Sequence, residues 1–193
     1  MQRIKEVLEE SIRLKQALLS HPKILQIVHT IAEEMTTALR NGNKVLFCGN
    51  GGSAADAQHL SAELTGRYYF DRPPLPAEAL HTNTSFLTAV ANDYSYDEVY
   101  SRAVKAFGKK GDVLFALTTS GGSKNILKAI SAANELGMMT VGFTGEKGAN
   151  LSELCSHTVV VPSTDTPRIQ ECHILLGHVI CEHIEKSLFS KKG

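Results

Sequence analysis

The chain has 193 residues, of which 42% are hydrophobic and 21% are charged, a composition typical of a globular protein rather than a disordered one. Its 20 basic and 20 acidic side chains cancel, which argues against a nucleic-acid partner, because surfaces that follow phosphates usually carry a basic excess. No apolar run approaches the ~20 residues that span a bilayer, and residues 1–10 lack a signal-peptide core, so we expect a cytoplasmic protein with no membrane partner.

Apolar residues recur at helical spacing in 1–20 and 22–39, which predicts two N-terminal helices. Short apolar runs then predict buried strands at 44–48, 112–118, 138–143 and 157–161, and a further short strand is predicted at 76–81. The segments predicted to be helical are 53–66, 84–92, 95–107, 123–137, 149–154 and 167–188. Strands that alternate with helices indicate an α/β fold with a parallel sheet covered on both faces.

We predict a single domain, with its α/β core at 44–190. Residues 1–40 precede the first strand, so they cannot be crossover connections, and we expect them to pack as an accessory or to form an oligomer interface. The four cysteines have neither zinc-site nor disulfide spacing, so buried reduced thiols are expected.

Two segments rich in Gly and Ser, 49–53 and 119–123, each join the end of a strand to the start of a helix. Ligands of open α/β sheets bind at such places, and free amides at a helix start favour an anion. Neither segment matches a P-loop or a dinucleotide-binding pattern, and helix capping by Ser or Thr would explain one such segment alone. Two of them in one sheet favour a phosphate site, with hydroxyls as donors from Ser53, Thr118, Thr119, Ser120 and Ser123.

His59 and Glu63 lie four positions apart in a predicted helix, which places them on one face about one turn apart. That arrangement suits one metal ion or one substrate hydroxyl, although an ordinary surface pair is the simpler explanation. Gln170 and His178 are eight positions apart on the last helix, about 12 Å along its axis, so both reach one point only if it lies off that helix. A polar residue at the helix start and a buried histidine are the simpler explanations there.

The segment 49–59 (GNGGSAADAQH) resembles the signature of the phosphoheptose isomerases, whose sugar-isomerase (SIS) domain is a doubly wound, flavodoxin-like parallel sheet. Four further segments agree with that family in the same order, namely 91–94 (ANDY), 101–102 (SR), 118–123 (TTSGGS) and 162–171 (PSTDTPRIQE). The similarity covers nearly the whole chain, including the N-terminal helices. One departure is Asn83, where many relatives carry an acidic residue, which puts in doubt any role for a carboxylate there.

The resemblance implies an enzyme that converts D-sedoheptulose 7-phosphate into D-glycero-D-manno-heptose 7-phosphate, the first step toward the activated heptose of bacterial surface polysaccharide. It also implies one Zn²⁺ per subunit and a homotetramer, with the last helix completing a neighbour's site. The implied zinc ligands are His59, Glu63, Gln170 and His178. The implied substrate-binding residues are Asn50, Gly51, Gly52, Ser53, Glu63, Asn92, Asp93, Thr118, Thr119, Ser120, Ser123 and Gln170.

This reaction moves a proton between C1 and C2 of an open-chain sugar through an enediolate, which requires a base at carbon and an acid–base group at the oxygens. As a hypothesis, we assign Glu63 as the carbon base and His178 as its acid–base partner, with zinc polarising the carbonyl. A coordinated Glu63 is a weaker base, so a mechanistic and a structural role for zinc both stay open.

Two other functions are compatible with this fold. One is a non-catalytic binding protein similar to the DnaA initiator-associating protein, which would have no need for Glu63 together with His178. The other is an isomerase of a different sugar phosphate, or a regulatory domain that only senses one. Because Glu63 and His178 are both present, with His59 and Gln170, we favour the heptose enzyme.

Overall fold

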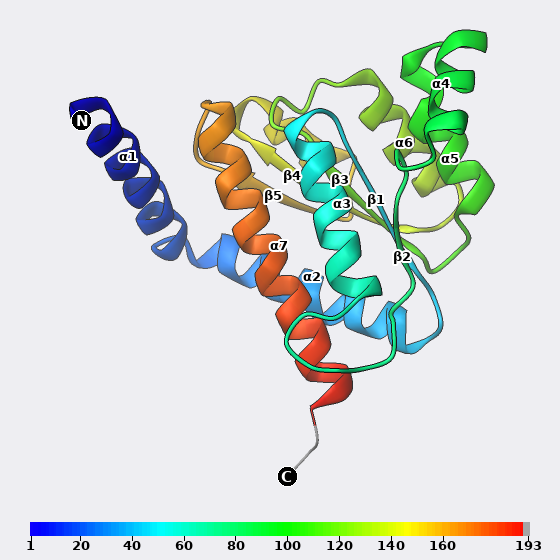
Figure 1. The fold of residues 1–193 in the computed structure, drawn as a ribbon, viewed down its shortest axis with the longest axis horizontal. Coiled ribbons are helices and arrows are strands. Elements are labelled where there is room, and N and C mark those ends of the chain that lie inside the picture. Colours follow the sequence, from blue (N-terminus) through cyan, green and yellow to red (C-terminus); the bar gives the residue numbers. More distant parts are fainter. Residues whose placement is uncertain (191–193) are drawn as a thin grey trace.

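A computed structural model describes residues 1–190, which form one five-stranded parallel sheet flanked by helices (Figure 1). The strands are β1 (Val45–Gly49), β2 (Ala77–Ala79), β3 (Val113–Leu117), β4 (Met139–Gly145) and β5 (His157–Val161). Their order in the sheet is β2-β1-β3-β4-β5, which is the order of flavodoxin-like doubly wound sheets. The predicted fold class is therefore confirmed, and the order reverses between β1 and β3.

Helices bury both faces of this sheet. On one face lie α2 (Pro22–Arg40), α3 (Gly52–Thr65) and α7 (Thr166–Phe189), and on the other lie α4 (Thr84–Asp93), α5 (Val99–Phe107) and α6 (Lys124–Glu135). Successive strand residues point to opposite faces, so Phe47 packs with the first set of helices and Leu46 with the second. Burial on both sides explains why β1 and β3 are apolar throughout.

The first helix, α1 (Gln2–Leu19), extends away from the body of the molecule (Figure 1). Its last turn buries Leu18 in the core, and the helix contacts α7 and α2. Four apolar residues of α1 stay exposed, namely Ile4, Leu8, Ile12 and Leu19. Across residues 1–190, none of the helices combines the length and the apolar character that a membrane crossing requires.

Three predicted elements differ in detail. The edge strand β2 has only three residues instead of 76–81, because its pairing with β1 begins at Ala77, after Pro76, and the chain turns at Leu80 and His81. The helix predicted at 95–107 divides into a 3₁₀ turn, η1 (Tyr96–Glu98), and α5. The helix predicted at 149–154 is part of a longer 3₁₀ segment, η2 (Glu146–Glu153). All four cysteines are free and at least partly buried, as predicted.

One buried histidine of α7 makes the fold sensitive to acid. His173 is fully buried, and its Nε2 lies 3.3 Å from the carbonyl oxygen of Thr144. Burial lowers the pKa of His173 from 6.5 to about 4, against a smaller opposite effect of that hydrogen bond. Because the unfolded chain therefore takes up a proton before the folded protein does, this stabilisation is complete above about pH 6.5 and is lost as the pH falls toward 4.

We expect this group alone to lower the free energy of unfolding by about 2 kcal/mol between pH 7 and pH 5. The His173→Gln variant should lack that component and show a shallower dependence on pH. Urea unfolding at a series of pH values measures the difference. Equal pH slopes for the two proteins would mean that His173 titrates normally in the folded protein.

Candidate active site

The turn between β1 and α3 depends on glycines. Gly51 has a φ of 56°, in the left-handed region that side chains disfavour. A Cβ on Gly49 would lie 2.4 Å from the carbonyl oxygen of Ser53, and one on Gly52 would lie 2.6 Å from the side-chain amide of Gln170. The sequence therefore allows a bare backbone turn that brings the start of α3 close to the start of α7.

The second Gly/Ser segment, 119–123, joins β3 to α6 beside the first. Gly121 has a φ of 67°, and a Cβ there would lie 2.3 Å from the Cα of Gly148, so the turn fits only a glycine. Between the two segments lies a cavity of about 320 Å³. It is lined by Asn50, Gly51, Gly52, Ser53, Leu117, Thr118, Thr119, Ser120, Ser123, Thr166 and Gln170. None of these described lining residues is charged.

The hydroxyls around this cavity are not used as helix caps. Ser123 stands at the N-cap of α6 but makes no side-chain capping bond, and the N-cap of α3 is Gly51. The hydroxyls of Thr118 and Ser120 accept hydrogen bonds from amides within their own turn, at 3.2 and 3.3 Å. Capping thus fails to explain these residues, and amides at helix starts with nearby hydroxyls are the groups that hold an anion.

Asn50 forms one wall of the cavity and is held in place by two neighbours. Its amide exchanges two hydrogen bonds of 2.9 Å with the amide of Asn125 on α6, and Tyr96 donates to its Oδ1 at 3.1 Å. These bonds connect the ends of β1 and β3 across the point where the strand order reverses. Ligands of doubly wound sheets bind at that point.

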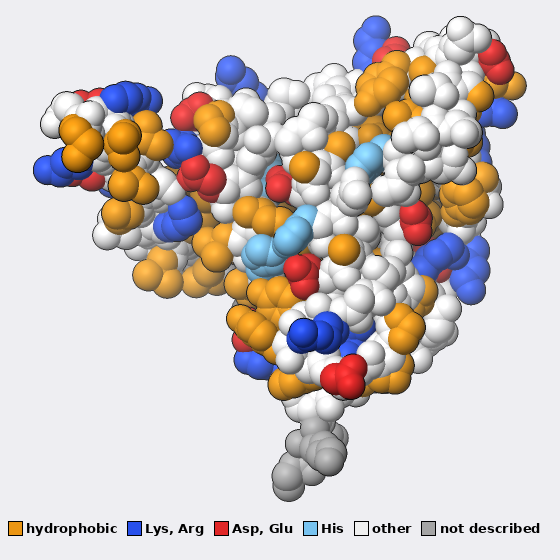
Figure 2. Space-filling model, in the orientation of Figure 1, with side chains coloured by type: hydrophobic (Ala, Val, Ile, Leu, Met, Phe, Trp, Pro, Cys, Tyr) orange, Lys and Arg blue, Asp and Glu red, His pale blue; other side chains and the backbone are white. Residues whose placement is uncertain are grey.

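A second group of polar residues follows further along α3. His59 and Glu63 lie one turn apart, with 3.2 Å between the His59 Nε2 and the Glu63 Oε1. His178 of α7 meets them, and its Nε2 lies 3.0 Å from that of His59. Histidines are visible at the surface between α3 and α7 (Figure 2). The donor atoms of all three residues lie within 4.8 Å of one another, so they could hold a metal ion.

His178 is suited to act as a neutral imidazole. Burial lowers its pKa, the nearby His59 lowers it further, and Glu63 raises it by less. The ring of Tyr68 lies 5.9 Å from the ring of His178, tilted by 36°. A neutral imidazole can bind a metal ion or exchange a proton with a sugar hydroxyl.

Asp56 is a residue that the sequence reasoning missed. It precedes His59 by three positions and Glu63 by seven, so all three occupy one face of α3. Burial raises its pKa to about 6, and its Oδ2 has no hydrogen-bond partner among residues 1–190. The helical spacing was the available signal, and it places a carboxyl with a perturbed pKa near His59.

Close packing of α3 against α7 brings these groups together. A Cβ on Gly177 would lie 2.6 Å from a methyl carbon of Leu60, so the helices approach closely one residue before His178. Gln170, earlier on α7, lines the cavity, with its Nε2 3.5 Å from the Ser53 hydroxyl. One chain alone therefore brings α7 to both the cavity and the cluster. A neighbouring chain is not needed for these contacts.

Asn92 and Asp93 occupy a different place. They are exposed at the end of α4, where the Asn92 amide donates to the Asp93 carboxylate at 2.9 Å. Neither residue is among those that line the cavity between the two Gly/Ser segments. Within one chain, the structure therefore brings the other predicted site residues to α3, α6 and α7 but not this pair.

A buried ion pair fixes the loop beside His178. The Arg72 Nε donates a hydrogen bond of 2.9 Å to the carboxylate of Glu185 on α7, and both side chains are only 1% exposed. The same carboxylate accepts hydrogen bonds from the backbone amides of Tyr68, Tyr69 and Phe70. Burial raises the pKa of Glu185, but these hydrogen bonds and Arg72 outweigh it, so the pKa is lowered overall. The loop that carries Tyr68 is thus anchored to α7.

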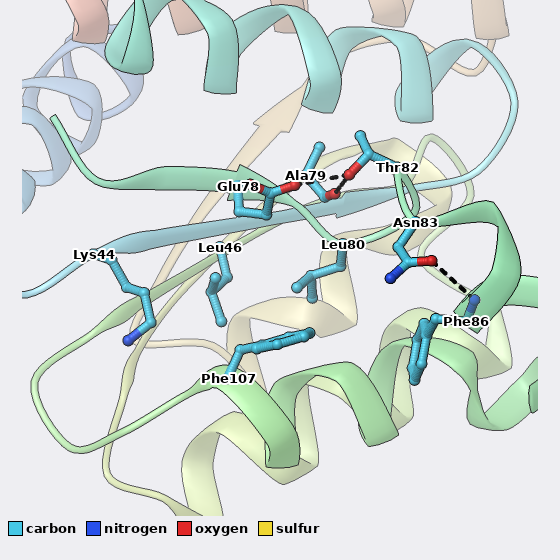
Figure 3. Close-up of a pocket in the computed structure, with 9 residues that line it drawn as sticks. All are labelled: Lys44, Leu46, Glu78, Ala79, Leu80, Thr82, Asn83, Phe86 and Phe107. Atoms are coloured by element: carbon cyan, nitrogen blue, oxygen red, sulfur yellow. Dashed lines mark hydrogen bonds between the residues drawn. The ribbon is translucent and has the colours of Figure 1, made fainter. Parts of the chain in front are cut away.

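A separate cavity of about 330 Å³ lies beside β2 and α4 (Figure 3). Its lining is mainly apolar, with Leu46, Leu80, Phe86 and Phe107. Asn83 borders it, but its side chain caps α4 by accepting the Phe86 amide at 3.0 Å. An acidic residue would make the same cap, so helix capping explains this position without a catalytic role.

Comparisons with known proteins agree with this fold. Residues 14–145 match the family model described as the SIS domain. The chain is 46% identical over 189 residues to a phosphoheptose isomerase of Aneurinibacillus thermoaerophilus, covering 98% of this chain and 96% of the relative. It is 50% identical over 187 residues to that of Mycobacterium tuberculosis, covering 97% and 95%.

Solved structures extend the likeness to three dimensions. The phosphoheptose isomerase of Neisseria gonorrhoeae superposes with a TM-score of 0.89 at 42% identity, covering 96% of this chain and 98% of that one. The enzyme of Francisella tularensis gives a TM-score of 0.91 at 36% identity, covering 96% and 97%. The similarity includes the N-terminal helices as well as the sheet.

Replacing Glu185 by Gln should test the anchored loop. Arg72 would then be buried without its partner, so we expect a loss of about 3 kcal/mol of stability and a lower kcat/KM as Tyr68 leaves His178. Thermal melting and steady-state kinetics measure both effects. The control is Glu182→Gln, which removes a partly exposed pair with Lys186 on the same helix and should cost no more than about 0.5 kcal/mol. Equal losses in the two variants would contradict the anchoring role.

Proposed function

The chain belongs to the phosphoheptose isomerase family of SIS-domain proteins, and we propose that Glu63 and His178 are its catalytic pair. As a member of that family it is a sugar-phosphate isomerase, which interconverts D-sedoheptulose 7-phosphate and D-glycero-D-manno-heptose 7-phosphate. The arrangement of the cavity and the histidine cluster along α3 is the observation that carries the proposed roles.

The two sites are spaced to suit a long sugar phosphate. Ser53 borders the cavity in the first turn of α3, and His59 follows six residues later, about 9 Å along the helix axis. That separation is comparable with the length of an open seven-carbon chain. We therefore place the phosphate among the hydroxyls of the cavity and the reacting carbons, C1 and C2, at the cluster.

The isomerisation then needs one carboxylate and one imidazole. Glu63 takes a proton from C1 of the ketose, which gives an enediolate, and then returns the proton to C2 of that enediolate, which gives the aldose. Neutral His178 gives a proton to O2 and receives one from O1, because its lowered pKa keeps the imidazole uncharged near pH 7. The number of protons on the enzyme is the same before and after the cycle.

The cluster also fits the divalent cation that the family resemblance implies. The donors of His59, Glu63 and His178 converge within 4.8 Å, and two imidazoles with one carboxylate are ligands that Zn²⁺ accepts. We propose one Zn²⁺ per chain on these three residues. Gln170, the fourth ligand that the resemblance implies, lies about 12 Å before His178 along α7, and its amide contacts Ser53 at the cavity rather than the cluster. When bound, the ion would polarise the substrate carbonyl.

We also propose that the protein works as a homotetramer in the cytoplasm. The exposed apolar residues of α1 offer an interface, since burying Ile4, Leu8 and Ile12 against a neighbour would remove apolar surface from water. In such an assembly, the exposed Asn92 and Asp93 are free to meet a substrate held by a neighbouring chain.

The non-catalytic alternative has less support. A protein that works only by contact with a partner gains nothing from a carboxylate and a neutral histidine converging beside a phosphate-sized cavity. An assay that offers sedoheptulose 7-phosphate or fructose 6-phosphate separates the remaining possibilities. Turnover of the heptulose alone supports the heptose reaction, and turnover of neither sugar with Zn²⁺ present would exclude it.

The Glu63→Gln variant should lose its base while keeping its shape. We expect kcat to fall by about 10²–10⁴-fold, with sugar-phosphate binding and thermal stability close to those of the wild type. The matched control is Glu135→Gln, because Glu135 is an exposed carboxylate far along α6 whose side chain is 63% exposed. Activity retained in Glu63→Gln would refute the base assignment.

Removal of the metal provides a separate test. Treating the protein with a chelator should lower turnover of sedoheptulose 7-phosphate, and adding Zn²⁺ should restore it, while Mg²⁺ should not because it prefers oxygen ligands. Full activity in chelator-treated protein that is free of zinc by elemental analysis would count against a catalytic metal.

A further inference from the structure

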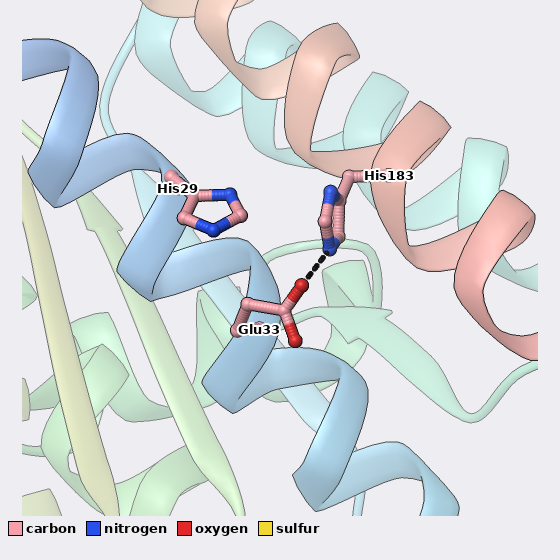
Figure 4. Close-up of side chains that lie close together, drawn as sticks. All are labelled: His29, Glu33 and His183. Atoms are coloured by element: carbon pink, nitrogen blue, oxygen red, sulfur yellow. Dashed lines mark ion pairs between the residues drawn. The ribbon is translucent and has the colours of Figure 1, made fainter.

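A second group of possible metal ligands lies away from the active site. His29 and Glu33 of α2 and His183 of α7 bring their donor atoms within 4.8 Å of one another (Figure 4). Among residues 1–190, this group and the active-site cluster are the two with that property. We propose that His29, Glu33 and His183 form a second metal site that takes a divalent transition-metal ion such as Zn²⁺.

The contact between Glu33 and His183 is the first reason. The Glu33 Oε1 lies 2.7 Å from the His183 Nε2, and yet that buried nitrogen makes no hydrogen bond. The nitrogen and the oxygen are thus close together, but no N–H points from one to the other. Two ligands of the same metal ion have this relation. Binding a cation there would give the buried nitrogen a partner. Without one, a buried unpaired polar atom lowers the stability of the folded protein.

The positions of the side chains are the second reason. The rings of His29 and His183 are 5.5 Å apart and nearly perpendicular, and Figure 4 shows Glu33 reaching toward His183 from below His29. Ligands of a tetrahedral zinc ion are about 3.3 Å apart, so small side-chain movements would complete the site. His29 and Glu33 are exposed and are free to make them.

Helix geometry explains why both clusters exist. His29 and Glu33 are one turn apart on α2, just as His59 and Glu63 are one turn apart on α3. His178 and His183 are five positions apart on α7, which turns their side chains by about 140° around the axis. Because α7 packs against both α2 and α3, each histidine meets one His–Glu pair.

This second site differs from the active site in its surroundings. None of its residues lines the cavity beside the Gly/Ser segments, so no substrate group is brought to it. Three protein ligands leave one position for water, and nitrogen with carboxylate donors favours Zn²⁺, Ni²⁺ or Cu²⁺ over Mg²⁺ or Ca²⁺. An ion there would link the N-terminal half of the chain to its last helix and stabilise that contact.

Zinc stoichiometry tests the proposal. Metal-free full-length protein is titrated with Zn²⁺ by calorimetry, with bound metal counted after dialysis. To count the second site alone, we use a protein with His59→Ala and Glu63→Gln, which should bind one Zn²⁺ per chain. Adding His29→Ala or Glu33→Gln to that background should abolish the binding, since loss of even an outer partner weakens a metal by about 10–100-fold.

The matched control is His157→Ala in the same background. His157 forms a similar pair with Glu34, at 2.9 Å, but no third metal ligand joins this pair among residues 1–190. That variant should still bind one Zn²⁺. The second site is excluded if the His59→Ala, Glu63→Gln protein binds no zinc, or if adding His29→Ala leaves its binding unchanged.

Two further measurements separate this site from the catalytic one. Zn²⁺ should raise the Tm of the His59→Ala, Glu63→Gln protein by a few degrees, and should not do so once His29→Ala is added. His29→Ala in the otherwise wild-type chain should keep the isomerase activity, because His29 lies outside the active site. Zinc bound only in proteins that retain His59 and Glu63 would overturn the second site and leave the catalytic proposal intact.

Discussion

The site depends on the close approach of α3 and α7 on one face of the sheet. Gly177 lets α7 approach Leu60, and the next residue, His178, meets His59 as a result. Gly52 similarly has no side chain, which leaves room for the Gln170 amide at the cavity. A side chain at either glycine would force the helices apart, so two small residues decide whether the phosphate cavity and the histidine cluster belong to one site.

Much of this arrangement could be read from the sequence because it is local. Apolar runs identified the strands, Gly/Ser segments identified the turns, and the spacing of His59 and Glu63 placed them on one face of a helix. His178 could be added only through the family resemblance, because no local pattern tells which helix α7 packs against. The sequence did not predict contacts between residues far apart in the chain, such as those of Glu185 with Arg72 and of His183 with Glu33.

Electrostatics explains how a neutral chain can accept a phosphorylated sugar. The cavity has no charged side chain among its described lining residues, and amides at helix starts with hydroxyls take the place of Lys and Arg. The charged and titratable groups gather instead about one to three turns along α3, where Asp56, His59 and Glu63 share a face. In the proposed reaction, phosphate binding and proton transfer take place at different points along α3, and the open sugar chain connects them.

The most direct test is a crystal structure of the Glu63→Gln variant bound to sedoheptulose 7-phosphate. We expect the phosphate between residues 50–53 and 118–123, with C1 and C2 beside His178 and the new amide at position 63. A phosphate seated elsewhere, or reacting carbons distant from His178, would contradict this placement.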